Sequence, residues 1–369
     1  MTEKKQRLPL CSSPFLTAVE KPEGVSPCCS RLSPSFDTHK VGEEWWNGEY
    51  LKEMRKKMFS YNTLPDFCKE CMRAGLVNSE AGYSNEYVRD LAYNETTGAV
   101  RSHPFSVHLF LGNKCNLACQ TCNANYSSGY AKLHGTEAEK DLFTDPFKLV
   151  ELYNPLNWTL YGGEPFMYPK LYDLLMRLMD TNGVISILTN GTIDLSRNRC
   201  YNEIIKRFPK KFCIGYSVDA EPNFNKYIRQ NTTDEMMQTI VNNIFLTVND
   251  KVYTNIHATI STINISQMYA FVDWGFKQRL WKHPNINFDV NVVKLPKEFS
   301  PIYSKLPDID LVEAANDKLR EVHNLYKSGI LPNISKEIER LILKIEKVVS
   351  HQRKFFSSRI PVIDLTNQQ

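Results

Sequence analysis

Two patterns of apolar residues alternate along the central part of the chain, from about residue 144 to residue 293: short continuous runs, and repeats at every third or fourth position. Short apolar or β-branched runs are typical of buried strands, whereas apolar residues repeated every three or four positions are typical of helices. Strand-like runs occupy residues 107–111, 158–161, 184–188, 212–218, 254–263 and 286–293. Helix-like runs occupy residues 171–179, 195–208, 236–248 and 267–278.

Six strands that alternate with helices imply parallel strands joined by right-handed crossovers, which is an α/β fold. The last part of the chain continues this pattern with two helical stripes that should face a core. The first stripe is Leu311, Ala315, Leu319, Val322 and Tyr326, and the second is Ile334, Ile338, Leu341, Ile342, Ile345 and Val349. We therefore expect an α/β domain followed by C-terminal helices.

Composition and charge narrow the possible partners only a little. The 369 residues carry a formal charge of +4 and 42% hydrophobic residues, which is ordinary for one or two globular domains. The basic run 206–211 is more typical of a solvated helix end than of a nucleic-acid patch. No apolar run approaches the length of a membrane span, and the N-terminal residues MTEKKQRLPL do not resemble a signal peptide. These features predict a cytoplasmic protein that binds neither nucleic acid nor membrane.

The ten cysteines are concentrated in the first third of the chain. In an intracellular protein such clustering indicates metal or redox chemistry rather than disulfides. The eight early cysteines are Cys11, Cys28, Cys29, Cys68, Cys71, Cys115, Cys119 and Cys122. The other two, Cys200 and Cys213, lie in apolar surroundings and are predicted to be ordinary buried thiols.

Three of these cysteines share one short loop after the strand predicted at 107–111. Cys115, Cys119 and Cys122 have the spacing C-x3-C-x2-C. Three thiolates can bind three irons of a [4Fe-4S] cube and leave the fourth iron open. The alternative is a structural zinc site, which needs four ligands, but no further Cys or His follows closely after Cys122. The spacing therefore favours an iron-sulfur cluster.

Glycine and polar residues follow the next predicted strands, where parallel α/β barrels carry their functional residues. These residues are Gly162, Gly163, Glu164, Asn190, Ser217 and Asp219. Glycines allow a ligand to approach the backbone closely, and a carboxylate suits an ammonium group. The alternatives are an ordinary strand-to-helix turn for the glycines and helix N-capping for Ser217 or Asp219. On the fifth strand Ser261, Thr262 and Asn264 are further candidates.

The cysteine loop, the Gly-Gly-Glu-Pro stretch and the Thr-Asn-Gly turn together resemble the radical SAM superfamily. This resemblance implies a partial (β/α)6 TIM-type barrel in which Cys115, Cys119 and Cys122 bind a [4Fe-4S] cluster. The open iron would bind S-adenosylmethionine, which the reduced cluster cleaves to a 5'-deoxyadenosyl radical. The Gly162-Gly163-Glu164 motif would hold the amino group of SAM, Asn190 would belong to the Thr-Asn-Gly turn, and Ser217 and Asp219 would contact its ribose and carboxylate. Many members carry an aromatic residue where this chain has Thr121.

The N-terminal third resembles the twitch domain, a shortened relative of the SPASM domain that binds one auxiliary [4Fe-4S] cluster. The implied ligands are Cys11, Cys68, Cys71 and either Cys28 or Cys29. Four residues separate Gly24 from Cys29, which is the usual gap in the family, whereas the Pro-Cys dipeptide favours Cys28. A four-cysteine zinc site is the alternative. The chain would then comprise a twitch-like module at 1–100, the barrel at 101–300 and a helical extension at 301–369.

The resemblance also guides the expected function. It implies a radical SAM enzyme that modifies a peptide or protein and takes its electrons from a reductant such as flavodoxin or ferredoxin. The second hypothesis is oxidation or rearrangement of a small molecule such as a sugar, nucleotide or alcohol. The third is a non-catalytic protein that binds zinc or an iron-sulfur cluster, which the Gly-Gly-Glu-Pro motif and the Ser217/Asp219 pair count against.

Overall fold

The computed structural model describes residues 11–28, 43–60, 68, 93–94, 96–100, 103–138, 145–283, 285–293, 297–301, 304–327 and 332–356. The chain divides into two compact units. The first comprises Met1–Tyr216 and Gln230–Thr254, and the second comprises Ser217–Arg229 and Asn255–Gln369. The functional modules expected at 1–100, 101–300 and 301–369 stay a prediction.

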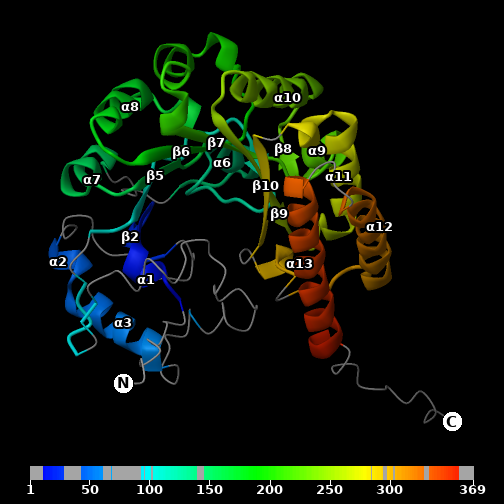
Figure 1. Cartoon of the computed structure of the whole chain (residues 1–369), viewed down its shortest axis with the longest axis horizontal. Helices are drawn as coiled ribbons and strands as arrows, with labels where there is room; N and C mark the ends of the chain where they lie inside the picture. Colours follow the sequence, from blue (N-terminus) through cyan, green and yellow to red (C-terminus); the bar gives the residue numbers. More distant parts are fainter. Residues whose placement is uncertain are drawn as a thin grey trace. The chain divides into compact units, whose positions relative to one another are not determined.

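Unit 1 is built on a mostly parallel sheet with the strand order β7-β6-β5-β3-β1-β2 (Figure 1). Its strands are β1 (Thr17–Lys21), β2 (Gly24–Ser26), β3 (Ser106–Phe110), β5 (Asn157–Tyr161), β6 (Val184–Thr189) and β7 (Phe212–Ser217). The pairs β1/β3, β3/β5, β5/β6 and β6/β7 are parallel, and only β2 runs antiparallel to its neighbour. The α/β class predicted from the sequence is therefore confirmed.

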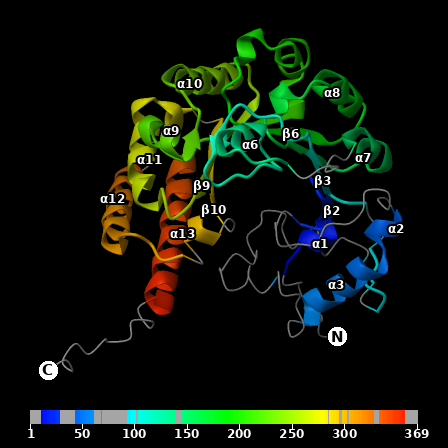
Figure 2. The same ribbon diagram turned by 180° about the vertical axis from the view of Figure 1, so that it is seen from behind.

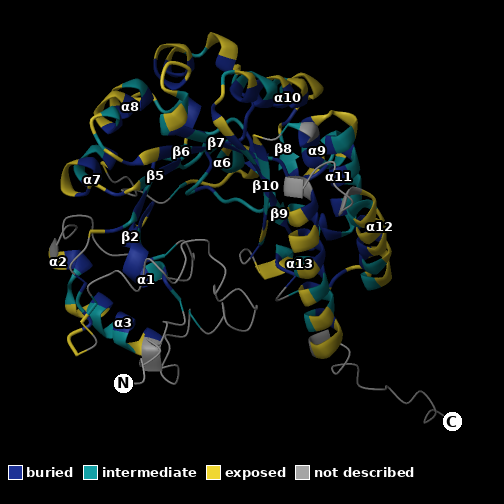
Figure 3. Cartoon of the chain, viewed as in Figure 1, coloured by how far each residue is buried: buried dark blue, intermediate teal, exposed yellow. Residues whose placement is uncertain are grey.

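Helices run along the outside of the strands in unit 1, as Figures 1 and 2 show for α7 (Pro146–Leu152), α8 (Leu171–Met179) and α10 (Asp234–Asn249). Helix α8 turns Leu171, Leu174, Leu175 and Leu178 inward, whereas Met176 on its other side is 49% exposed. The same contrast between buried strands and exposed outer helix faces is visible in Figure 3. The helices predicted at 171–179 and 236–248 are thus present with the expected inward faces.

One predicted helix is broken. The pattern predicts a helix at 195–208, but the structure has a 3₁₀ turn η3 (Leu195–Arg197) and a π-helical turn η4 (Tyr201–Ile205). Asn198 lies between them in an extended conformation, and its side chain accepts the Tyr201 N–H at 3.1 Å. An asparagine that caps a new turn competes with a continuous helix, which explains the break.

The N-terminal strand β1 enters the sheet in register with β3, with Thr17 opposite Ser106 and Val19 opposite His108. The remaining described elements of this part are α1 (Ser13–Leu16), α2 (Glu43–Trp46) and α3 (Glu49–Ser60). Arg55 of α3 is buried, stacks 4.6 Å above the Trp46 ring and donates Nε to the Pro14 carbonyl at 2.9 Å. These contacts tie α1, α2 and α3 to one another.

Unit 2 contains β9 (Tyr253–Ile260) except for its first two residues, β10 (Ile286–Val292) and the helices α9 (Pro222–Ile228), α11 (Met268–Lys277), α12 (Ile309–Lys327) and α13 (Pro332–Phe356). The strand predicted at 254–263 ends earlier, at Ile260, because Asn264 Oδ1 accepts the Ser261 N–H at 2.7 Å and closes a turn. Every strand required by a partial (β/α)6 barrel is present along the chain, and the helix predicted at 267–278 is confirmed as α11.

The two C-terminal helices are also confirmed, but the first of them buries a different residue near its start from the one predicted. Leu311 was predicted to face the core, but it is 51% exposed, and its neighbour Val312 is buried instead. Val312 lies three residues before Ala315 and seven before Leu319, so these three side chains share one helix face. On α13, Lys344 donates its Nζ to the Val290 carbonyl of β10. No helix in the described ranges is long and apolar enough to cross a membrane.

Candidate functional site

The cysteine loop leaves the sheet directly after β3. Cys115 and Cys122 lie in the loop, Cys119 ends the short strand β4 (Ala118–Cys119), and all three side chains are half-buried. The Cys122 N–H donates to the Cys119 carbonyl at 2.9 Å, which forms a tight turn between the second and third thiols. Three thiols on one loop are thus held close to the end of a parallel strand.

Two serines fasten this loop to helix α6 (Ser128–His134). Ser127 caps the helix by accepting the Tyr130 N–H at 3.0 Å, and its own hydroxyl donates to the Leu117 carbonyl at 2.6 Å. The Ser128 hydroxyl accepts the Cys115 N–H at 3.0 Å. The loop shape is therefore set by side chains that directly follow the cysteines, and the sequence motif did not reveal these roles.

The Gly-Gly-Glu stretch packs backbone against backbone on the start of the cysteine loop. The Gly163 N–H donates to the Gly112 carbonyl, and the Glu164 N–H donates to the Lys114 carbonyl, both at 2.8 Å. A Cβ atom on Gly162 would lie 2.6 Å from the Gly112 oxygen, and one on Gly163 would lie 2.4 Å from the Lys114 oxygen. Only glycine permits this approach, so these two motifs form one structural unit.

The Glu164 carboxylate forms hydrogen bonds with other groups of the protein itself. Its side chain is buried and accepts hydrogen bonds from the Thr189 hydroxyl at 2.7 Å, the Asn190 N–H at 2.7 Å and the Phe166 N–H at 3.1 Å. A carboxylate has about four lone-pair positions, so three protein donors leave little capacity for a ligand. Glu164 therefore joins the Gly-Gly-Glu-Pro turn to the Thr-Asn-Gly turn, and its predicted contact with an ammonium group stays a prediction.

Asn190 brings the Thr-Asn-Gly turn to the first cysteine. Its Nδ2 donates to Asn116 Oδ1 at 2.9 Å and lies 3.9 Å from Cys115 Sγ. The Leu117 N–H also donates to this sulfur, at 3.5 Å. Burial raises the pKa of the Cys115 thiol, with a smaller contribution from the negative charge of Glu164. Burial disfavours a bare thiolate. The positive charge of bound iron would offset this effect and favour the thiolate, which is the form of cysteine that binds metal.

Helix α10 supports the same turn from behind. The buried Asn243 side chain donates to the carbonyls of Gly191 at 2.8 Å and Ile193 at 2.7 Å, and it accepts the Leu195 N–H at 3.0 Å. Gly191 has a φ of +74°, which favours glycine. Asn243 was not recognised from the sequence because an asparagine inside a helix gives no distinctive pattern.

The predicted residues Ser217 and Asp219 lie in unit 2. Asp219 is buried, accepts the Thr259 N–H at 2.8 Å and forms an ion pair with Arg229 at 2.8 Å. Its carbonyl accepts the Asn264 amide at 2.8 Å. Asp219 therefore organises the end of β7 rather than capping a helix, and Asn264, a predicted candidate, supports it. Arg229 was missed because a single arginine just after the end of α9 has no distinguishing signal in the sequence.

Of the N-terminal cysteines, Cys11, Cys28 and Cys68 are described, whereas Cys29 and Cys71 lie outside the described residues. The pKa of Tyr50 is raised, first by burial and then by the negative charges that Cys68 and Cys28 can carry. Tyr50 thus lies near both cysteines although they are forty residues apart in the sequence. The predicted set of four ligands stays a prediction.

Of the remaining two cysteines, which were predicted to be ordinary buried thiols, Cys200 is buried and Cys213 is half-buried. Burial raises the pKa of Cys200 and of Cys213 to about 11. Among the residues that the structure describes, no three His, Cys, Asp or Glu side chains converge on a single point as ligands of one metal ion do.

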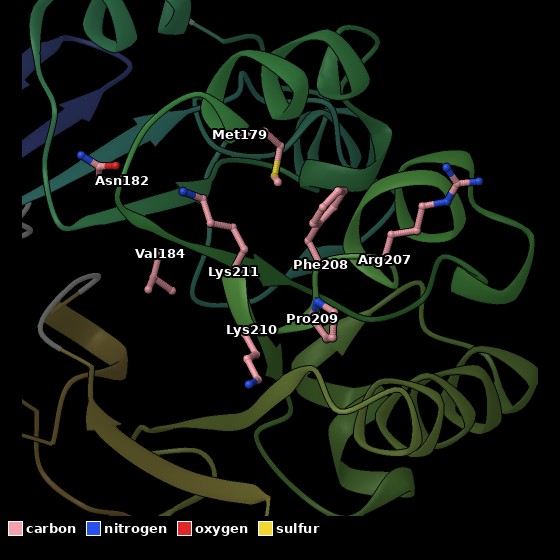
Figure 4. A pocket seen from close by; sticks show the side chains of 8 residues that line it. All are labelled: Met179, Asn182, Val184, Arg207, Phe208, Pro209, Lys210 and Lys211. Carbon is pink, nitrogen blue, oxygen red and sulfur yellow. The ribbon is translucent and has the colours of Figure 1, made fainter.

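A pocket of about 570 Å³ lies away from the cysteine loop, at the opposite ends of β6 and β7 (Figure 4). It is lined by Val184, Phe208 and the cations Arg207, Lys210 and Lys211, among others. Phe208 is 52% exposed, and the Lys211 ammonium donates to the Thr181 carbonyl. The pocket therefore belongs to the basic run 206–211 and not to the candidate site.

Comparisons with known proteins give structural likenesses only. No protein-family model matches the chain, and no curated protein matches it significantly. Native anSMEcpe with bound AdoMet is 17% identical, with a TM-score of 0.42 over 60% of this chain and 61% of that chain. SuiB from Streptococcus suis, bound to S-adenosylmethionine, is 12% identical, with a TM-score of 0.44 over 87% of this chain and 70% of that one. TYW1 with a lysine-pyruvate adduct is 17% identical, with a TM-score of 0.36 over 59% of this chain and 73% of that chain.

The residues present suit an iron-sulfur cluster with an open iron. The donor set is three thiols on one loop, and two N–H groups point at the first of them. Hydrogen bonds to ligating sulfurs are a regular feature of iron-sulfur sites and adjust their reduction potentials. Gly162 and Gly163 lie directly against the loop that carries these thiols, because a side chain on either glycine would clash with the loop backbone.

Proposed function

We propose that this chain is a radical SAM enzyme. Cys115, Cys119 and Cys122 would hold the [4Fe-4S] cluster, which when bound supplies an electron for reductive cleavage of S-adenosylmethionine. The observation that carries the proposal is the interlock of three separate motifs. Gly163 and Glu164 bind the cysteine loop through their backbone, and Asn190 reaches both Asn116 and Cys115.

The chain's own residues would orient the ligand rather than react with it. Gly162 and Gly163 pack directly against the backbone of the cysteine loop and hold it in place, and Glu164 and Asn243 fix the Thr-Asn-Gly turn from two sides. Ser217 and Asp219 would contact the ribose and carboxylate of SAM. In this assignment the protein orients SAM and the substrate and excludes water from them, and the cofactor supplies the radical chemistry.

The substrate we propose is a peptide or protein, on the basis of the twitch-like N-terminal cysteines. These cysteines would bind a second, auxiliary [4Fe-4S] cluster. The alternative is a small-molecule substrate. If the chain is instead a non-catalytic metal-binding protein, the test below would show no cleavage of SAM. A flavodoxin or ferredoxin would serve as reductant.

The test is anaerobic reconstitution of the full chain with iron and sulfide, followed by incubation with SAM and dithionite. We expect formation of 5'-deoxyadenosine and methionine, detected by mass spectrometry. Alanine variants of Cys115, Cys119 and Cys122 should each abolish cleavage, whereas the Cys200→Ala variant should not, because that thiol is buried away from the loop. Cleavage at the parent rate in any of the first three variants would contradict the proposal.

The substrate class is tested in the same reaction mixture. Candidate peptides and a pool of small metabolites are added separately, and the mass of every component is compared before and after incubation. A peptide mass change that depends on SAM supports the peptide assignment. A changed small molecule together with unchanged peptides would establish the alternative.

A further inference from the structure

Three side chains beside the first cysteine of the loop form a closed ring of hydrogen bonds. Asn116 Nδ2 donates to the Thr192 hydroxyl at 2.8 Å, and this hydroxyl donates to Asn190 Oδ1 at 2.7 Å. Asn190 Nδ2 donates in turn to Asn116 Oδ1 at 2.9 Å, which closes the ring. Because Asn116 directly follows Cys115 and the other two residues follow β6, the ring joins the cysteine loop to the Thr-Asn-Gly turn.

The backbone of Thr192 determines which way the Asn190 amide points. The Thr192 N–H donates to Asn190 Oδ1 at 2.9 Å. A backbone N–H can only donate, so the oxygen of the Asn190 amide must face it and the nitrogen must face away from it. Both residues are buried, so little water competes for these hydrogen bonds.

The amide nitrogen that is oriented in this way faces Cys115. Asn190 Nδ2 carries two hydrogens. One of them is donated to Asn116 Oδ1, and the other is left for Cys115 Sγ, which lies 3.9 Å from the nitrogen. The ring therefore holds an N–H group against the first sulfur of the loop.

A buried carboxylate near this sulfur acts in the opposite direction. Glu164 Oε2 accepts the Asn190 backbone N–H at 2.7 Å, and the charge of Glu164 adds to the larger effect of burial in raising the pKa of the Cys115 thiol. An iron-sulfur cluster gains negative charge when it is reduced, so a nearby carboxylate makes reduction harder. A hydrogen bond to a ligating sulfur draws negative charge from it and makes reduction easier.

We propose that the ring of Asn116, Asn190 and Thr192 raises the reduction potential of the [4Fe-4S] cluster by holding the Asn190 amide N–H against Cys115 Sγ. Asn190 supplies the hydrogen bond, and Asn116 and Thr192 are positioning residues. One electron passes from the reductant to the cluster, and no bond to Asn190 forms or breaks. This inference rests on the proposed function, and it concerns how readily a flavodoxin or ferredoxin can reduce the cluster.

The test is a redox titration of the reconstituted full chain without SAM, followed by electron paramagnetic resonance. The signal of this cluster is the one that is absent from the variant lacking all three cysteines of the loop. Asn190→Leu keeps a side chain of similar size but has no amide N–H. At a fixed solution potential its ratio of reduced to oxidised cluster should be lower about tenfold, which for a one-electron couple is a midpoint about 59 mV lower.

Variants of Thr192 separate the position of the amide from packing. Thr192→Val has nearly the same volume but loses the hydroxyl that links Asn116 to Asn190, so its midpoint should fall, by less than in Asn190→Leu. Thr192→Ser retains the hydroxyl and should keep the parent midpoint. The matched controls Asn202→Leu and Thr239→Val remove side chains that bond to carbonyls elsewhere, and they should also keep it.

Each result decides the proposal. A midpoint in Asn190→Leu or Thr192→Val equal to that of the parent would overturn it, and so would an equal fall in Thr192→Val and Thr192→Ser. If neither Asn190→Leu nor Thr192→Val binds the cluster while Thr192→Ser and the controls do, the ring is required for cluster assembly, and its role in setting the potential is wrong.

The proposed function fails in a different way. A parent protein that binds the cluster but makes no 5'-deoxyadenosine contradicts the radical SAM assignment, whereas a lower midpoint in Asn190→Leu would still support the role of the ring. A parent that cleaves SAM, together with variants that share its midpoint, refutes the role of the ring alone. If the parent binds no cluster at the cysteine loop, both proposals are wrong.

Discussion

Glu164 shows how a single residue can connect two motifs that are far apart in the sequence. Its carboxylate accepts three protein hydrogen bonds in a buried position. In the Glu164→Ala variant the Thr189 hydroxyl and two N–H groups would lose their acceptor. A buried donor left without a partner costs about 1–3 kcal/mol, so we expect the free energy of unfolding to fall by about 3 kcal/mol or more.

Urea denaturation of the protein without added iron would measure this change, and SAM affinity would be determined separately by calorimetry. Glu164→Gln should lose less stability, because its amide oxygen still accepts. Glu321→Ala, an exposed change on α12, is the control. A Glu164→Ala variant as stable as the parent would contradict the bridging role.

Gly163 gives a second prediction at the residue scale. A Cβ atom there would lie 2.4 Å from the Lys114 carbonyl, which directly precedes Cys115. We expect Gly163→Ala to displace the cysteine loop and to lower the iron bound after reconstitution several-fold. Gly135→Ala is the matched control, since no atom lies within 4 Å of its Cβ position and its φ of +61° costs only about 1 kcal/mol. If the two variants bound equal amounts of iron, the close packing at Gly163 would not be required for the protein to bind iron.

At the scale of elements, most strands could be predicted from the sequence, whereas the side chains that hold the turns between them could not. The apolar runs at 107–111 and 184–188 correspond to β3, which is mostly buried, and to β6, whose buried residues alternate along the strand. Strand β1 was missed because Glu20 and Lys21 are buried there, which hides the apolar pattern. Likewise Asn243 and Arg229 act through contacts with residues distant in sequence, which no local pattern records.

The burial of Glu20 gives β1 a pH-dependent stability. Burial raises the pKa of Glu20 to about 8, against 4.5 for the ordinary group, while the Phe110 N–H donates to Oε2 at 2.9 Å. The fold therefore favours the protonated acid, so its contribution is complete below about pH 4.5 and is lost as the pH rises to about 8.

Between pH 6.5 and 8 the free energy of unfolding should fall by about 2 kcal/mol through this group, at 1.36 kcal/mol per pH unit. The contribution of His108, whose pKa burial lowers from 6.5 to about 4, falls mostly below this interval, and it is shared by the parent and the Glu20→Gln variant. Urea denaturation at several pH values, for the parent and for Glu20→Gln, would show the effect as the difference between the two slopes. Parallel slopes would mean that Glu20 does not titrate in this range.

At the scale of the whole molecule, the proposed cofactor content can be counted. Two [4Fe-4S] clusters predict about eight irons per chain, and a variant lacking Cys115, Cys119 and Cys122 should retain about half of them. The remaining cluster should be visible by electron paramagnetic resonance after reduction. The structure brings Cys28 and Cys68 close to Tyr50, which supports a shared site for these two cysteines.

Parallel Cys28→Ala and Cys29→Ala variants in that background would identify the fourth ligand, since only one should lose the signal. A triple variant that contains one zinc and no iron would establish the alternative metal site. It would also remove the auxiliary cluster on which the proposed peptide chemistry relies.

The hydrogen bond from Lys344 to the Val290 carbonyl has a consequence for the behaviour of the protein in concentrated solution. Strand β10 is an edge strand whose only neighbour among the described strands is β9, so its outer carbonyl and N–H groups could pair with a strand of another molecule. Helix α13 places an ammonium group on one of these carbonyls. A charged side chain at this position opposes edge-to-edge aggregation, so the C-terminal helix helps to keep copies of the protein apart.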